Sequence, residues 1–130
     1  MSCFNCEQGY GNWFKKGVLQ ILDLTHDYRR YAKPGFWMDP DMLQVGNGLT
    51  DSQNRAHFVL WAMLSAPLML GNDLRDMDKK TLSLLIDKDI IKINQDPRGV
   101  PAFRYMKNKE LEISVNESQE IVDSRYGLNL

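Results

Sequence analysis

Apolar residues recur every three to four positions in three stretches of the chain, which is the spacing of a buried helix face. The first stretch predicts an amphipathic helix over residues 13–23. A second helix should begin after Thr50, because Thr50 and Gln53 have the capping-box spacing in which each side chain bonds the other's backbone N–H. Residues 56–64 of that helix are apolar nearly all round, so we expect it to be buried. The third stretch predicts a helix over residues 82–90.

Two short extended segments alternate with these helices. Residues 36–38 follow Pro34 and Gly35, which stop a helix and favour a turn, so they predict a short strand. Residues 67–71 are too few for a helix and lack alternation, as in a central parallel strand that is covered on both faces. The order strand, helix, strand, helix predicts parallel βα units with right-handed connections, and therefore the α/β fold class.

The apolar period changes from about 3.6 to 2 towards the C-terminus. Phe103 and Tyr105 alternate with polar residues, and a second alternating run covers residues 111–115. Two such runs around a polar turn predict a β-hairpin. We therefore expect βα units in residues 1–99 and the start of an antiparallel β domain in residues 100–130.

The length of the chain does not suit a complete barrel of such units. A closed (β/α)8 barrel needs roughly 250 residues, whereas this chain has 130 residues. Two or three βα units alone would leave apolar strand edges unpaired. We expect the chain to be a piece, cut at both ends, that needs the rest of its sheet.

Composition excludes several other partners. The chain has 16 basic and 17 acidic residues and a formal net charge of -1, without the basic block that nucleic-acid binding requires. Its apolar stretches are shorter than the ~18 residues of a membrane helix, and its start lacks a basic-then-apolar signal segment. We expect neither nucleic acid nor a membrane as partner, and the sequence leaves the cellular compartment open.

Two cysteines, Cys3 and Cys6, are separated by two residues. This spacing is compatible with a local disulfide, two free thiols, a redox pair or half of a zinc site. A structural zinc site usually needs four protein ligands, and the histidines, His26 and His57, lie in segments of helical pattern. We therefore predict no metal and no cofactor, and we expect His57 to be a packed or capping side chain.

Acidic residues follow the predicted strand at residues 36–38, where a barrel strand would face an active site. Retaining glycoside hydrolases use two carboxyl groups ~5 to 5.5 Å apart. Asp39 and Asp41 are poorly suited to that pairing, because two acids at one strand end project in similar directions instead of flanking a glycosidic bond. Asp-x-Asp is otherwise a turn or capping motif. Trp37 and Trp61 could stack on a sugar ring or be core aromatics.

Several segments resemble the α-galactosidases of glycoside hydrolase family 27. Residues 37–43, Trp-Met-Asp-Pro-Asp-Met-Leu, and residues 45–48, Val-Gly-Asn-Gly, closely resemble the hallmark of that family. The resemblance extends from about residue 13 to residue 105. Further blocks in the family's order are residues 55–58, 60–63, 65–68, 71–75 and 93–97.

The resemblance implies a TIM barrel followed by an antiparallel β-sandwich, which cleaves terminal α-galactosides, or related sugars such as α-N-acetylgalactosaminides, with retention of configuration. It implies that this chain is the C-terminal part of that barrel, its last two or three βα units, and that its partner is the missing N-terminal part of the barrel. It implies that Asp41 and Met42 contact the sugar and that Asp39 and Trp37 support them. Met38 departs from the asparagine that is usual at its position, which can alter the surroundings of the sugar pocket.

The same resemblance implies that this chain holds no catalytic carboxylate. The family's nucleophile lies in a Lys-x-Asp-type motif that the sequence does not contain. Its acid/base aspartate would fall immediately before Met1, and the nearest acids, Glu7 and Asp23, do not match. We expect the chain alone to be inactive. The alternatives are a small standalone carbohydrate-binding or interaction module built around Asp41 and, ranked last, a redox protein.

Overall fold

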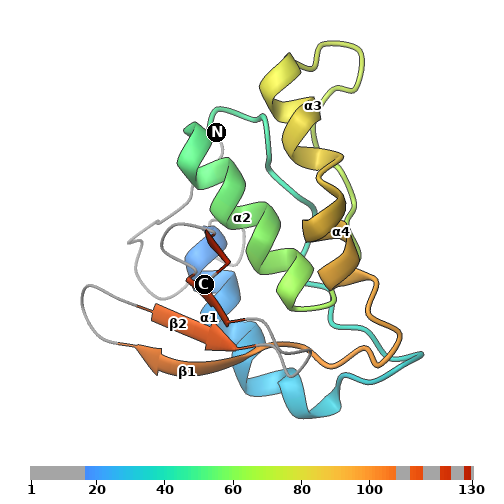
Figure 1. Cartoon of the computed structure of the whole chain (residues 1–130), viewed down its shortest axis with the longest axis vertical. Coiled ribbons are helices and arrows are strands. Elements are labelled where there is room, and N and C mark those ends of the chain that lie inside the picture. Colours follow the sequence, from blue (N-terminus) through green and yellow to red (C-terminus); the bar gives the residue numbers. More distant parts are fainter. Residues whose placement is uncertain (1–16, 108–111, 116–120, 124–127, 130) are drawn as a thin grey trace, which may run out of the picture.

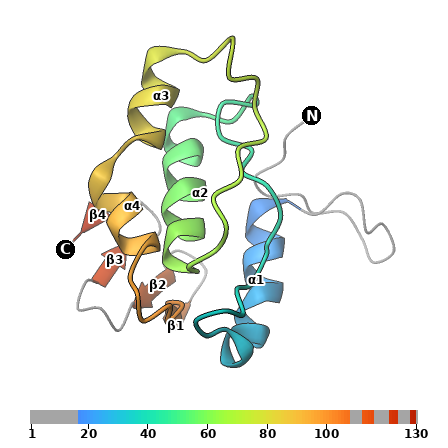
Figure 2. The same cartoon turned by 90° about the vertical axis from the view of Figure 1, so that its right-hand side faces the viewer.

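The computed structural model describes residues 17–107, 112–115, 121–123 and 128–129. Helix α2 lies between α1 on one side and α3 with α4 on the other, and a small antiparallel sheet lies near the end of α2 (Figures 1 and 2). The helical elements are α1 (Val18–Tyr28), the 3-10 helix η1 (Arg29–Tyr31), α2 (Asp51–Met63), α3 (Lys79–Leu85) and α4 (Lys88–Asn94). The strands are β1 (Phe103–Lys107), β2 (Glu112–Val115), β3 (Ile121–Asp123) and β4 (Leu128–Asn129).

Helix α1 extends further than its apolar pattern predicted. The predicted end at residue 23 is wrong, because the helix continues to Tyr28 before η1. The Thr25 hydroxyl donates to the Leu22 carbonyl at 2.9 Å, so this polar side chain has a hydrogen-bond partner within the helix. Polar residues on the outer face therefore do not end the helix. Residues 13–16 of the predicted helix lie outside the described residues.

Helix α2 confirms both of its predicted features. The Thr50 hydroxyl accepts from the Gln53 N–H at 3.3 Å, and the Gln53 side chain accepts from the Thr50 N–H at 3.0 Å. Every residue from Ala56 to Met63 is buried. This part of the helix is therefore enclosed all round, as its nearly continuous apolar sequence requires.

The predicted third helix is two helices, which corrects the single span over residues 82–90. Asp87 has an extended backbone and accepts from the N–H groups of Asp89 at 3.0 Å and Ile90 at 3.3 Å, so it caps the start of α4. A residue that caps a new helix in this way cannot continue the previous one. The apolar period could not reveal this break, because Ile86 and Ile90 stay four positions apart.

The parallel pairing lies later in the chain than the sequence suggested. Residues 36–38 are not a strand, since Phe36 pairs back across the Pro34–Gly35 turn with Lys33. Leu43 instead makes a parallel bridge to Leu70, donating to the Met69 carbonyl at 2.8 Å and accepting from the Gly71 N–H at 3.0 Å.

The predicted central strand at residues 67–71 is reduced to this one bridge. Met69 is 57% exposed and Leu70 is also exposed, so the segment is not covered on both faces. No further strand pairs with either segment within the described residues. The parallel direction of the predicted unit is confirmed, but the predicted regular strands are absent from these two segments.

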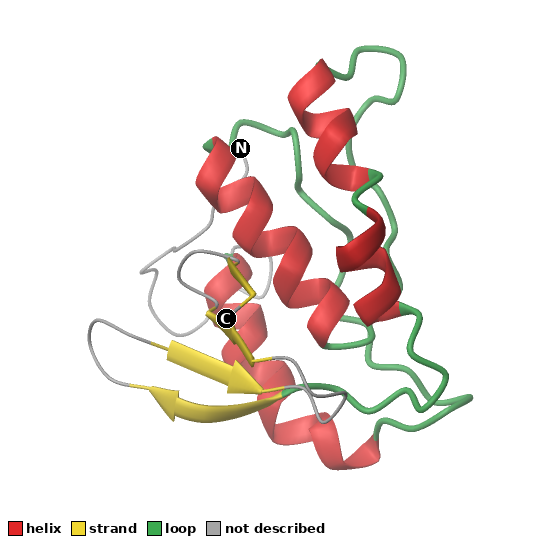
Figure 3. Ribbon diagram, in the orientation of Figure 1, coloured by secondary structure: helices red, strands yellow, loops and turns green. Residues whose placement is uncertain are grey.

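The predicted hairpin is confirmed, since β1 and β2 are antiparallel with an irregularity between Arg104 and Met106 (Figure 3). Strands β3 and β4 continue the sheet in the order β1-β2-β3-β4, which the sequence did not predict. The sheet is tied to the helices, because Ala102 donates to the Met63 carbonyl at 2.8 Å and Arg104 forms an ion pair with Asp23.

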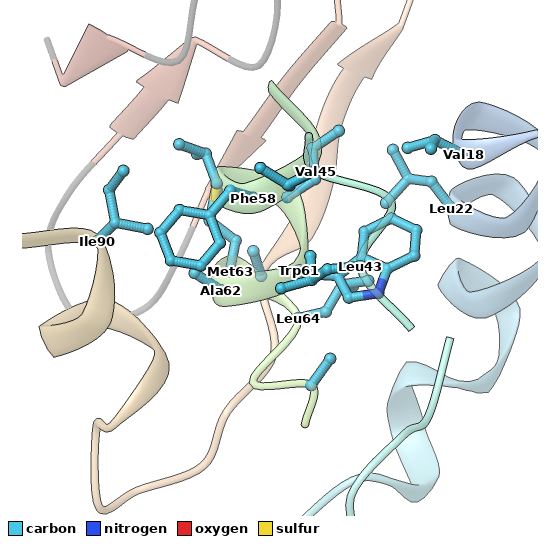
Figure 4. Packing of buried hydrophobic residues seen from close by; sticks show 14 residues of the cluster. Val18, Leu22, Leu43, Val45, Phe58, Trp61, Ala62, Met63, Leu64 and Ile90 are labelled. Carbon is cyan, nitrogen blue, oxygen red and sulfur yellow. The ribbon is translucent and has the colours of Figure 1, made fainter. Parts of the chain in front are cut away.

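The hydrophobic core is built around α2. Figure 4 shows Val18 and Leu22 of α1 at one side of the cluster and Ile90 of α4 at the other, with side chains of α2 between them. Leu43 and Val45 are fully buried in the same cluster. The core therefore fixes the segment that directly follows Asp41 and Met42.

Candidate functional site

The loop that carries the predicted site residues has an unusual backbone conformation. Asp41 has a φ of +82°, in the left-handed region that L residues other than Asn and Asp seldom adopt. Its N–H donates to Asp39 Oδ1 at 3.0 Å, and its own Oδ1 accepts from the Met42 N–H at 2.7 Å. The structure therefore brings Asp39, Asp41 and Met42 together in one tight turn.

Three side chains of α2 hold this loop from the core side, and we call them the α2 polar face: Asn54, His57 and Trp61. Their spacing of three and four residues places them on one side of the helix. Trp61 Nε1 donates to the Asp41 carbonyl at 2.8 Å. His57 Nε2 accepts from the Gln44 N–H at 2.9 Å, and Asn54 Oδ1 accepts from the Gly46 N–H at 3.0 Å.

His57 is a neutral member of this face. Its side chain is 1% exposed, and burial lowers the pKa of the imidazole from its usual 6.5 to about 4. An imidazole whose Nε2 accepts a hydrogen bond carries its proton on Nδ1. The ring meets Trp61 edge to face, with centroids 4.2 Å apart. His57 is therefore the packed histidine that the sequence predicted, and it also supports the Gln44 backbone.

The predicted sugar contacts are open to solvent. Asp39 and Asp41 are exposed, and Met42 is 46% exposed. Asp41 Oδ2 has no hydrogen-bond partner within the described part of the chain. The loop thus exposes two residues adjacent in sequence, one with a carboxylate and one with a thioether.

Trp37 lies in different surroundings. A Cβ added to Gly99 would lie 2.5 Å from the Trp37 ring, so the indole covers that glycine closely. The Trp37 side chain is 48% exposed and also lines a cavity of about 400 Å³. Asp41 and Met42 do not line this cavity, whose other walls are Pro34, Ser65, Ala66, Pro67 and residues 94–97.

The charged cleft between α2 and α3 is a separate feature of about 430 Å³. Lys80 pairs with Asp51 at 2.9 Å on its rim, with both side chains mostly exposed. Such exposed pairs contribute little to stability or recognition. Asp41 and Met42 do not line this cleft either.

Across residues 17–107 and the three described strand segments that follow, no group of His, Cys, Asp and Glu side chains could hold a metal ion. Within that part of the chain, no helix is long and apolar enough to cross a bilayer. Cys3 and Cys6 lie outside the described residues.

Sequence reasoning missed the α2 polar face as a functional feature. The sequence pattern indicates for Trp61 only a core or stacking aromatic, and it indicates no role for Asn54. The available signal was a set of hydrogen-bonding side chains at helical spacing within an otherwise apolar helix. Buried polar groups need partners, so such residues indicate a neighbouring backbone segment.

Comparison with known proteins identifies the family of this chain. The sequence model of the family described as alpha galactosidase A (Melibiase_2) matches residues 5–96. The chain belongs to this family. Alpha-galactosidase A of Cellvibrio japonicus is 48% identical to it over 113 residues, which are 87% of this chain and 28% of that enzyme.

Solved α-galactosidase structures share the arrangement of this chain. A Bacteroides fragilis protein provisionally named alpha-galactosidase/melibiase superposes with a TM-score of 0.81 at 33% identity, over 95% of this chain and 29% of that one. The α-galactosidase of Saccharomyces cerevisiae with raffinose superposes with a TM-score of 0.72 at 27% identity, over 82% and 27%. The chain thus spans less than a third of the length of these family members.

Proposed function

We propose that this chain supplies part of the sugar pocket of a retaining α-galactosidase-type glycoside hydrolase that acts on terminal α-linked galactosides. The observation that carries the proposal is the exposed Asp41–Met42 turn, in which Asp41 Oδ2 has no partner among the described residues and the Asp41 carbonyl is bonded to the buried Trp61. Membership of the α-galactosidase family supports the reaction class. The yeast relative, which was solved with raffinose, supports the sugar class.

In this proposal, residues 1–99 form the last βα units of a (β/α)8 barrel and residues 100–130 begin a β-sandwich. The parallel bridge between Leu43 and Leu70, with α2 between them, has the connectivity of one βαβ unit. The exposed Met69 and Leu70 then pack against the missing N-terminal part of the barrel. The hairpin of β1 and β2 supports the second domain.

Asp41 and Met42 have separate roles in the proposed pocket. Ionised Asp41 accepts hydrogen bonds from sugar hydroxyls through Oδ2, and bonds to a charged acceptor contribute about 1.5 to 3 kcal/mol each. Met42 packs its thioether on the apolar face of the sugar. Asp39 fixes the Asp41 backbone through the 3.0 Å bond, and Trp37 supports the start of the segment against Gly99.

The catalytic carboxylates lie outside this chain in the proposal. Asp39 and Asp41 both bond backbone groups of one turn, so they lie together on one side of any bound sugar. Retention requires a nucleophile and an acid/base group on opposite sides of the scissile bond. The chain alone therefore binds a galactoside weakly and does not hydrolyse it.

The test is a titration of the full chain with methyl α-D-galactoside, followed by the backbone amide signals of Asp41 and Met42 in NMR spectra. We expect saturable shifts at these amides, and much weaker shifts with methyl α-D-glucoside. The matched variant Asp41→Asn removes the charge, keeps a side chain that tolerates the left-handed backbone, and should weaken binding at least tenfold.

Three results would contradict the proposal. Equal responses to the two sugars, or shifts that persist unchanged in Asp41→Asn, would show that this turn is not a galactoside site. Turnover of an aryl α-galactoside that survives repurification and disappears in Asp41→Ala would show that a catalytic carboxylate is present after all.

A further inference from the structure

We propose that Trp61 is a positioning residue for this site: its indole N–H holds Asp41 in the left-handed backbone conformation and thereby orients the Asp41 carboxylate and Met42. The inference deepens the proposed function and rests on it, because it concerns the same turn. Trp61 does not touch the sugar in this proposal, since it is 1% exposed.

The first step is that Asp41 needs an external constraint. A φ of +82° is disfavoured for a residue with a Cβ, so the turn would relax if nothing held it. Within the turn, the Asp41 N–H donates to Asp39 Oδ1 and the Met42 N–H donates to Asp41 Oδ1, and both carboxylates are exposed to water. Water competes for these exposed acceptors, so the local bonds hold the turn only in part.

The second step is that the Asp41 carbonyl has one rigid partner. Trp61 Nε1 donates to this carbonyl at 2.8 Å from inside the core. If Asp41 moved to an ordinary conformation, its carbonyl would turn away and the buried indole N–H would lose its acceptor. The cost of an unpaired buried donor therefore opposes relaxation of the turn.

The third step is that Trp61 itself cannot follow a moving loop. It lies in the last turn of α2, within the run of buried residues from Ala56 to Met63. The edge-to-face contact with His57 fixes the indole plane, and His57 in turn bonds the Gln44 N–H. The α2 polar face thus hydrogen-bonds the backbone on both sides of Met42, at Asp41 and at Gln44.

The fourth step links these backbone hydrogen bonds to sugar binding. Asp41 Oδ2 and the Met42 side chain project from the backbone atoms that the left-handed conformation orients. A binding group has to be pre-oriented by its surroundings to contribute its full affinity. Trp61 therefore affects binding through the direction of Asp41, without a contact of its own.

The test replaces Trp61 with 3-benzothienylalanine, which keeps the ring shape but has sulfur in place of the N–H. Incorporation of 5-fluorotryptophan at the same site is the conservative control, because it retains the N–H. The conformation of Asp41 is read from its intraresidue HN–Hα nuclear Overhauser effect, which is strong in left-handed backbone. Ser65, the other described non-glycine residue with positive φ, is an internal control.

We expect the benzothienyl variant to lose the strong Asp41 signal, to keep the Ser65 signal, and to bind methyl α-D-galactoside about tenfold more weakly. The fluorotryptophan variant should behave as the unmodified chain. A strong Asp41 signal in the benzothienyl variant would overturn the inference. So would a lost Asp41 signal with unchanged sugar affinity.

The two proposals fail in different ways. If the unmodified chain shows no galactoside binding, the proposed function fails, whereas the Asp41 signal still decides whether Trp61 fixes the turn. If the sugar binds and the Asp41 conformation does not depend on the Trp61 N–H, the proposed function stands and the positioning role fails.

Discussion

The buried His57 makes the stability of this chain depend on pH between about 6.5 and 4. In the folded chain burial lowers its pKa from the usual 6.5 to about 4. Between these values the unfolded chain binds a proton that the folded chain does not, so unfolding is favoured as the pH falls. The stability contributed by neutral His57 is complete above pH 6.5 and is lost on acidification.

The size of the effect follows from the two pKa values. Each pKa unit corresponds to ~1.4 kcal/mol, so the full gap amounts to about 3 kcal/mol. Between pH 7.5 and pH 5 the expected loss is about 2 kcal/mol, because most of the gap is crossed there. Hydrogen bonds to Arg75 and Arg98 lower the folded-state pKa values of Asp73 and Asp96. Protonation of these two acids therefore destabilises the folded chain only at a pH below the range in which His57 has its effect.

The matched variant is His57→Gln, whose side-chain oxygen can accept from the Gln44 N–H but cannot titrate in this range. Urea unfolding of the full chain, followed by far-UV circular dichroism at pH 7.5 and pH 5, gives the two free energies of unfolding. We expect the loss of about 2 kcal/mol in the unmodified chain and little change in the variant.

A control variant, His26→Gln, removes the other histidine of the chain and should keep the pH dependence of the unmodified chain. If the unmodified chain and His57→Gln lose the same free energy on acidification, His57 is not a buried neutral acceptor. That result would also remove one of the three supports of the Asp41 loop.

Three further substitutions test the local structure. Gly71→Ala would place a Cβ 2.8 Å from the Leu43 carbonyl, so we expect it to disrupt the parallel bridge and cost roughly 1–3 kcal/mol in urea unfolding. Thr50→Ala removes the cap that pairs with Gln53 and should cost about 1 kcal/mol, whereas Thr50→Ser should be nearly neutral. Asp41→Ala should be less stable than Asp41→Asn by about 1 kcal/mol, because alanine tolerates the left-handed backbone poorly.

The sequence by itself determined the local elements whose causes are local. The capping box of Thr50 and Gln53, the burial of α2 and the turn at Pro34 and Gly35 follow from neighbouring side chains and backbone preferences. The alternation that begins at Phe103 likewise sufficed for the hairpin. The order of the motif blocks sufficed for the family.

Only the tertiary structure decided where the parallel pairing lies and how the site is held. Pairing at Leu43 instead of residues 36–38 depends on a partner at Leu70 that is distant in sequence. The left-handed Asp41 and its bond to Trp61 depend on packing α2 beneath the loop. Residue patterns specify which groups prefer burial, whereas the contacts between distant segments determine which backbone group each buried donor meets.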